Sequence, residues 1–280
     1  MSLSPPPTDV IHRHSLLVRV THWINALALV LLLMSGFNIF NAHPSLYLGK
    51  QSTFDRPALA MTYVQRPDKS YAGVVRVGGA EITTTGLFGL SRRDGRLEAR
   101  GFPSWATIPA YGDLATARHW HFFFAWVLAL NGLVYAAHGL LTRHVQRDLW
   151  TPPLELRKIP AEIWHHLRLR FPTGEAARSY NVLQRLSYFG VVFVLGPLVI
   201  LTGLSMSPGV NAALGNILPE LFGGRQTARA IHFTCAALFV LFIIVHLVMV
   251  LLSGVSNNLR SMITGRYVLP RPKVTPETRA

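Results

Sequence analysis

Four stretches of the chain contain no Asp, Glu, Lys or Arg, and each exceeds the length that an α-helix needs to cross a bilayer. They cover residues 20–49, 119–142, 186–219 and 230–259. Because roughly 20 apolar residues span the hydrocarbon core, the sequence predicts an all-α integral membrane protein, a bundle of four transmembrane helices forming one domain over residues 1–280. The expected spans are about 20–40, 119–141, 183–205 and 230–253.

The distribution of Lys and Arg predicts how these spans are oriented. Residues 1–19, 143–185 and 260–280 hold 2, 8 and 5 of them, whereas the connection 205–229 holds two. Cytoplasmic loops are rich in Lys and Arg, so we expect a multi-pass protein of the bacterial cytoplasmic (inner) membrane with both termini in the cytoplasm. The connection 41–118 carries ten, but long loops translocate largely regardless of charge, and we place it outside.

Two further patterns lie outside the spans. Alternating apolar residues at 74–77 and 81–85 predict a short hairpin in the long extracytoplasmic loop. Residues 164–170 resemble a basic amphipathic helix on the membrane surface. Because the placement of Lys and Arg follows membrane topology, we attribute the net charge of +14 to topology. No nucleic-acid partner is expected.

Histidines at the ends of the spans are the candidate functional residues, because ionisable groups within a membrane are energetically costly. His232 and His246 are fourteen residues apart in the fourth span, so both lie on one helix face, separated by about 21 Å. His22 lies at the same inner depth as His246, and His121 at the same outer depth as His232. Two haems, each between two histidines, explain this arrangement.

Neighbouring residues narrow the choice of histidine. His119 and His121 differ by 200° around a helix, so at most one faces the bundle. Gly132, on the same face as His121, leaves room for a porphyrin and favours His121, and Gly36 lies at the outer haem's depth. His138 lies off that face and is interpreted as an interfacial or structural residue.

The single cysteine, Cys235, limits the type of haem. One cysteine allows no internal disulfide and no Cys-x-x-Cys-His motif for covalent attachment. The haems are therefore expected to be non-covalent haem b.

At these residues the sequence resembles the di-haem b-type cytochrome subunit family of respiratory Ni-Fe hydrogenases and formate dehydrogenases. It is most similar to the branch that accompanies periplasmic molybdopterin oxidoreductases. The resemblance covers all four spans, and the long loop and the tail match less clearly. The matching motifs are Arg19-x-x-His22-Trp23 with Ser35-Gly36, Arg118-His119-Trp120-His121-Phe122, Tyr180-Asn181-x-x-Gln184, Thr202-Gly203-Leu204 and the His232/His246 pair.

The resemblance implies a role in a respiratory chain. The axial ligand pairs of the haem irons would be His22/His246 and His121/His232. The chain would be the electron-transfer subunit of an oxidoreductase complex. It would couple a quinone (menaquinone or ubiquinone) to a periplasmic catalytic redox subunit, for example one containing molybdopterin. Asn181 and Gln184, one turn apart at the inner start of the third span, could offer amide groups to the quinone.

Two other functions remain open on the sequence. One is a self-sufficient di-haem oxidoreductase that acts on a small substrate such as superoxide or ferric iron. The other is a transporter that uses the histidines as proton relays.

The long loop 41–118 is itself a candidate docking surface for the periplasmic partner, because loops of this length are usually functional or disordered. A lid over the outer haem is the alternative. The aromatic and arginine residues expected to anchor the partner are Phe102, Trp105, Tyr111, Arg92, Arg93 and Arg100.

Overall fold

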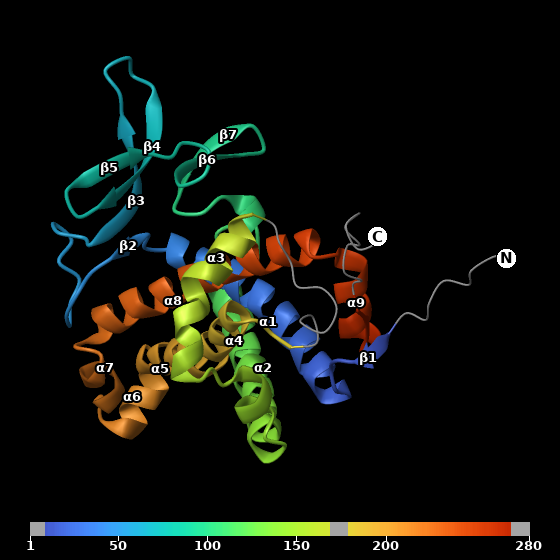
Figure 1. The fold of residues 1–280 in the computed structure, drawn as a ribbon. Coiled ribbons are helices and arrows are strands. Elements are labelled where there is room, and N and C mark those ends of the chain that lie inside the picture. The colour runs from blue at the N-terminus through green and yellow to red at the C-terminus, as the bar shows by residue number, and fades with distance from the viewer. Residues whose placement is uncertain (1–8, 169–178, 270–280) are drawn as a thin grey trace. The chain divides into compact units, whose positions relative to one another are not determined.

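The computed structural model describes residues 9–168 and 179–269 of the chain and is mostly helical (Figure 1). Four helical segments are long and apolar enough to cross a membrane, with mean hydropathies of 1.9, 1.5, 2.0 and 3.1 in their most apolar windows. They confirm the four predicted spans. These are α1 (Leu16–Asn41), α2 (Leu114–Leu141), the third span Val182–Ser205, and α8 (Arg225–Leu252).

Two of these helices begin about five residues before the predicted positions. Arg118 lies inside α2, and Arg225 and Arg229 lie inside the first turns of α8, so charge-free sequence marks the membrane part of a helix rather than its start. Asp113 caps α2 because its carboxylate accepts hydrogen bonds from the backbone N–H of Thr116 (3.0 Å) and from its hydroxyl (2.7 Å).

The third span is interrupted in its middle. It consists of α4 (Val182–Phe189), a π-helical segment η5 (Gly190–Leu195) and α5 (Gly196–Ser205). Pro197 lacks a backbone N–H, and its ring conflicts with the carbonyl one turn earlier. The wider π turn just before the proline accommodates that conflict.

The connection between α1 and α2 is folded into strands. The predicted hairpin corresponds to β4 and β5, with Val75 opposite Ile82, but the other strands were not predicted. One antiparallel sheet has the order β2-β3-β4-β5, and β6 pairs with β7. The elements are β2 (Ser45–Leu46), β3 (Leu59–Gln65), β4 (Tyr71–Val77), β5 (Ala80–Thr83), β6 (Gly89–Arg93), β7 (Arg96–Arg100) and the short helix η1 (Ser104–Ala106).

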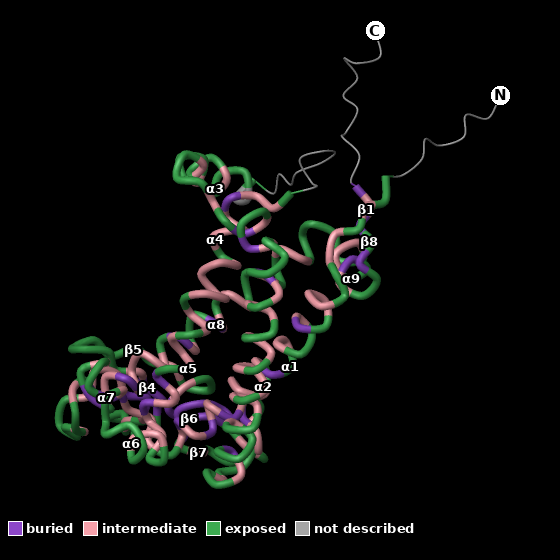
Figure 2. The backbone as a smooth tube through the Cα atoms, turned by 90° about the horizontal axis from the view of Figure 1, so that it is seen from below, coloured by how far each residue is buried: buried purple, intermediate pink, exposed green. Residues whose placement is uncertain are grey.

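The described residues divide into two contact-dense units, each treated separately below. One contains residues 24–131 and 196–238. Its core is an aromatic cluster in which Phe102 stacks on Phe37 (4.1 Å between ring centroids) and contacts Phe40 and Phe233. In Figure 2 buried backbone gathers around β4 and β6 of this unit. This unit also contains α6 (Pro208–Leu214) and α7 (Ile217–Leu221).

The other unit contains the described residues of 1–23, 132–195 and 239–280. Strand β1 pairs antiparallel with β8, with Ile11 opposite Tyr267. The segments just before the first span and just after the fourth therefore lie next to each other. This agrees with an even number of spans, which returns the chain to the same side of the membrane. The remaining elements here are β1 (Val10–His12), η2 (Val145–Leu149), η3 (Pro153–Lys158), α3 (Ile159–Leu167), α9 (Val255–Thr264) and β8 (Arg266–Val268).

Helix α3 covers most of the predicted amphipathic segment 164–170. The last two residues of that segment lie outside the described residues.

Candidate functional site

The structure brings the four predicted histidines together as two pairs, one within each unit. We call His121–His232 the outer pair and His22–His246 the inner pair, after the predicted orientation. The ring centroids of the outer pair are 6.1 Å apart and the rings are inclined at 62°. Those of the inner pair are 6.3 Å apart and inclined at 54°.

These separations can be compared with the spacing that one iron would impose. An imidazole nitrogen binds a first-row metal at about 2.0 Å and lies about 1.1 Å from its ring centroid, so two imidazoles in line on opposite sides of an iron have centroids about 6 Å apart. Both pairs match this value. Within the described residues no group of three or more His, Cys, Asp or Glu could hold a metal ion. A metal here needs a group that supplies its other ligands, as a porphyrin does, and the donor set therefore fits haem.

Each imidazole of the outer pair is held through its Nδ1 atom by a neighbouring helix. Nδ1 of His121 lies 3.2 Å from the carbonyl oxygen of Leu32 and 3.1 Å from the hydroxyl of Ser35, both on α1. In the same way, Nδ1 of His232 lies close to two groups on α5. They are the carbonyl oxygen of Val199 at 2.9 Å and the hydroxyl of Thr202 at 3.2 Å.

The carbonyl oxygens decide the protonation of these rings. A carbonyl can only accept a hydrogen bond, so Nδ1 of His121 and of His232 must carry the proton and donate it. The opposite nitrogen, Nε2, then keeps its lone pair, which is the form that binds a metal.

Two glycines allow this close approach of helix and ring. A Cβ atom added to Gly36 would lie 3.3 Å from Cε1 of His121, and one added to Gly203 would lie 3.3 Å from Cε1 of His232. Gly36, which was expected only to lie at the depth of the outer haem, thus makes room for the imidazole. A Cβ added to Gly132 would meet no atom within 4 Å.

The inner pair has a different environment. His22 contacts Trp23 edge-on at 5.2 Å, and His246 stacks on Phe242 at 5.6 Å between ring centroids. Nδ1 of His22 is buried and has no hydrogen-bond partner among the described residues. In the described part of the chain, no hydroxyl and carbonyl pair orients this ring as in the outer pair.

Polar contacts fix the helix ends near each pair. Arg229, one turn before His232 on α8, donates to the backbone carbonyls of His43 (2.6 Å) and Ser45 (2.9 Å). Near the inner pair, Arg19 and Trp23 donate to backbone carbonyls in the last turn of α9 (Ile263 and Met262). The charge of Arg19 is favourable at a helix C-terminus because of the helix dipole, and its contact together with that of Trp23 holds α9 against the start of α1.

The candidate quinone residues form a helix cap at the start of α4. Oδ1 of Asn181 accepts from the backbone N–H of Gln184 (2.9 Å), and Oε1 of Gln184 accepts from that of Asn181 (3.2 Å). This reciprocal pair is a capping box. Each amide oxygen accepts one backbone hydrogen bond in the cap, and a contact to a substrate carbonyl would have to come from an NH₂ group, because only an N–H donates.

A histidine and a tyrosine lie beside that cap. The hydroxyl of Tyr180 lies 3.4 Å from Nδ1 of His14, and the guanidinium of Arg13 lies over the rings of Tyr180 and Tyr267. Burial, reinforced by the charge of Arg13, lowers the pKa of His14 to about 4. Burial also raises the pKa of Tyr180. Both side chains are therefore neutral near pH 7.

The remaining histidines of the second span lie apart from the pairs. His119 is exposed, and His138 is half-buried; neither ring contacts the imidazole of a paired histidine.

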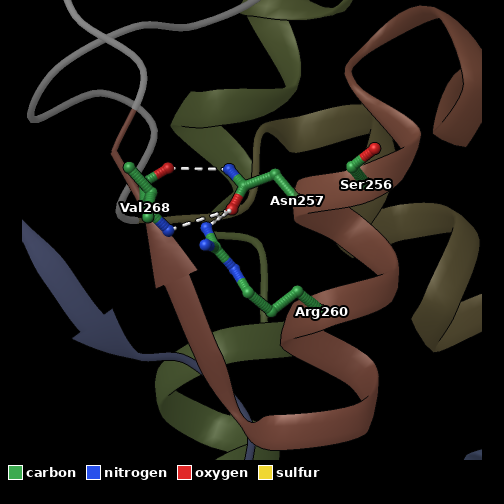
Figure 3. Close-up of a pocket in the computed structure, with 4 residues that line it drawn as sticks. All are labelled: Ser256, Asn257, Arg260 and Val268. Atoms are coloured by element: carbon green, nitrogen blue, oxygen red, sulfur yellow. Dashed lines mark hydrogen bonds between the residues drawn. The ribbon is translucent and has the colours of Figure 1, made fainter.

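A surface pocket between α9 and β8 is also unrelated to the histidines. Its polar groups bond to one another: Asn257 pairs with both backbone groups of Val268, and Arg260 donates to Asn257 (Figure 3).

Sequence reasoning missed Ser35 and Thr202 as site residues and noted them only as parts of motifs. The available signal was a hydroxyl residue followed by glycine in two different spans. Both hydroxyls are fully buried in apolar helices, where a polar group suggests a function.

Comparison with known proteins also points to a membrane cytochrome. Residues 13–265 match the family described as prokaryotic cytochrome b561. A protein of Azospira oryzae named "Putative protein-methionine-sulfoxide reductase subunit YedZ1" is 28% identical over 251 residues, which cover 89% of this chain and 93% of that protein. No solved structure matches the chain.

Proposed function

Since the chain belongs to the prokaryotic cytochrome b561 family, which implies haem b, we propose that it carries electrons between a membrane quinone and an extracytoplasmic redox enzyme through two haem b groups. The observation that supports this most directly is the pair of imidazole spacings, 6.1 and 6.3 Å. Each suits one iron held from both sides.

In this proposal the four histidines hold the irons and the rest of the chain orients them. Haem b, when bound, supplies a one-electron couple between ferric and ferrous iron. His121 and His232 would present Nε2 to the outer iron, and His22 and His246 would hold the inner one. Oxidising or reducing a quinone by two electrons also moves two protons, so a quinone at the inner end would exchange protons with the cytoplasm.

The test of this proposal is the haem content of the purified protein. We expect two haems per chain, both extractable without breaking a covalent bond, and a reduced-minus-oxidised spectrum typical of b-type cytochromes. One haem per chain would contradict the two-site arrangement, and none would contradict the function as a whole. Rapid reaction of the isolated protein with superoxide or ferric iron would favour the self-sufficient oxidoreductase instead.

The extracytoplasmic partner is expected to be a redox enzyme, because the Azospira relative is named a reductase subunit. We propose that the connection between α1 and α2 docks it. The segment that follows β7 is tied to α1 by several hydrogen bonds. Ile108 N–H donates to the Met34 carbonyl (3.2 Å), and the Asn38 side chain donates to the carbonyls of Pro109 (2.9 Å) and Tyr111 (3.2 Å).

Among the predicted anchors, two are part of the protein's own core. Phe102 belongs to the aromatic cluster, and the buried guanidinium of Arg100 donates to the Ala110 carbonyl (2.8 Å) and the Thr107 hydroxyl (3.0 Å). Trp105 and Tyr111 are 70% and 52% exposed. They are the best candidates, because they lie on the segment tied to the helix that carries Ser35.

Replacing both Trp105 and Tyr111 with alanine should lower the affinity for the partner enzyme by at least tenfold, since exposed aromatics are frequent interface hot spots. The measurement is the affinity of the co-purifying enzyme and its rate of electron exchange with the haems. Tyr71→Ala is the matched control, because Tyr71 is 48% exposed on the same connection but lies on β4. Equal affinity for the double variant and the wild type would mean that docking occurs elsewhere.

A further inference from the structure

We propose that Ser35 and Thr202 are positioning residues that set the rotation and donor strength of the two outer haem ligands. This inference rests on the proposed function, because it concerns the ligands of a haem. It goes further in assigning a role to two hydroxyls and in making the two haem sites chemically different.

The same arrangement occurs twice, on two different helices. On α1, the hydroxyl of Ser35 and the carbonyl of Leu32, three residues earlier, both face Nδ1 of His121. The next residue is the glycine that admits the ring. On α5, Thr202, Val199 and Gly203 repeat this pattern around His232.

The hydroxyl hydrogens are already used within the helices. Ser35 donates to the carbonyl of Leu31 at 2.6 Å, and Thr202 donates to that of Leu198 at 2.7 Å. Their contacts to the carbonyls three residues earlier are longer, 3.2 and 3.1 Å. A lone pair of each hydroxyl oxygen therefore faces the imidazole, and each Nδ1–H is shared between two acceptors.

Two acceptors on Nδ1–H change the ring as a ligand. They draw the proton away from the ring and leave more negative charge on it, which makes Nε2 a stronger donor. A stronger donor stabilises ferric iron more than ferrous iron, so these contacts lower the reduction potential of the outer haem. In the inner pair, Nδ1 of His22 has no such partner among the described residues, so this ligand lacks the effect.

The experiment is a potentiometric titration of the purified holoprotein with the variants Ser35→Ala and Thr202→Val. Each removes one acceptor and keeps the neighbouring glycine. We expect the midpoint potential of the outer haem to move to a more positive value in each, and further in the double variant. The inner haem should not move, and the low-spin ferric EPR signal of the outer haem should shift with its potential.

Conservative variants and controls separate this effect from general disturbance. Ser35→Thr and Thr202→Ser keep the hydroxyl and should return values close to wild type. Ser205→Ala and Thr234→Val remove hydroxyls that bond only to backbone carbonyls, those of Thr202 and Ala230. They should leave both haems unchanged.

The outcomes distinguish this inference from the proposed function. Loss of the outer haem in Thr202→Val, with its retention in Thr202→Ser, would also support positioning by the hydroxyl. A wild-type potential and EPR signal of the outer haem in the double variant would overturn the inference, as would equal shifts in the controls. A wild-type protein without haem would refute the proposed function instead.

Discussion

A His232→Ala protein should contain one haem per chain instead of two, and the haem that disappears should be the outer one. The outer iron would lose one of the two histidines that would hold it, while the inner pair, His22 and His246, belongs to the other contact-dense unit of the chain. Haem extraction with a redox titration is the measurement, in which one of two one-electron waves should vanish. His121→Ala should give the same result.

The reciprocal variants complete this prediction. His22→Ala and His246→Ala should remove the inner wave and keep the outer one. His119→Ala and His138→Ala are the matched controls, since both histidines lie in α2 without facing a paired ring, and both should retain two haems. Added imidazole should restore part of the lost wave, because it can occupy the space that the side chain leaves. Two haems in the His232→Ala protein would exclude this ligand assignment.

The four spans were predictable because a helix that crosses hydrocarbon needs about 20 consecutive residues without charge, and a helix in water does not. Their starts were not, since Arg118 and Arg225 are tolerated in the turns at the membrane surface, where the side chain reaches water. Strand β3 was missed because its neighbouring residues Ala60 and Met61 are both buried. That burial removes the alternation by which a half-exposed strand is recognised.

The approximate place of each histidine was predictable from helix period and depth alone. The groups that hold the outer rings were not, because two of them are backbone carbonyls, those of Leu32 and Val199. A carbonyl within a helix has no sequence signature. Its availability to Nδ1 depends on how closely two helices approach, and that distance is set here by Gly36 and Gly203.

The two candidate quinone residues also stabilise the fold. Asn181 and Gln184 already have a structural role as the cap of α4, so replacing either with leucine would lose the cap as well as any contact to a quinone. Removing a helix cap lowers the stability of the folded protein by about 1 kcal/mol. Slow electron exchange between quinone and an Asn181→Leu protein would therefore not identify Asn181 as a binding residue.

Variants that keep the capping oxygen and remove only the NH₂ group resolve this. Asn181→Asp and Gln184→Glu retain the acceptors for the two backbone N–H groups, and Asn181→Ser caps without adding charge. If both NH₂ groups donate to a quinone carbonyl, each is worth about 1 kcal/mol, and the double variant should exchange electrons with quinone roughly thirtyfold more slowly. The fold and both haem spectra should be unchanged.

The measurement is the rate at which quinol reduces the haems, or quinone re-oxidises them, while a quinone-analogue inhibitor is titrated against each variant. Slow exchange and weak inhibition in the Asp, Glu and Ser variants would support donation by the amides. Wild-type behaviour in these three, with loss only in the leucine variants, would leave Asn181 and Gln184 as a helix cap and nothing more. The neutral pair of His14 and Tyr180 beside the cap would then be the next place to test, because it could still pass a proton between a quinone and the cytoplasm.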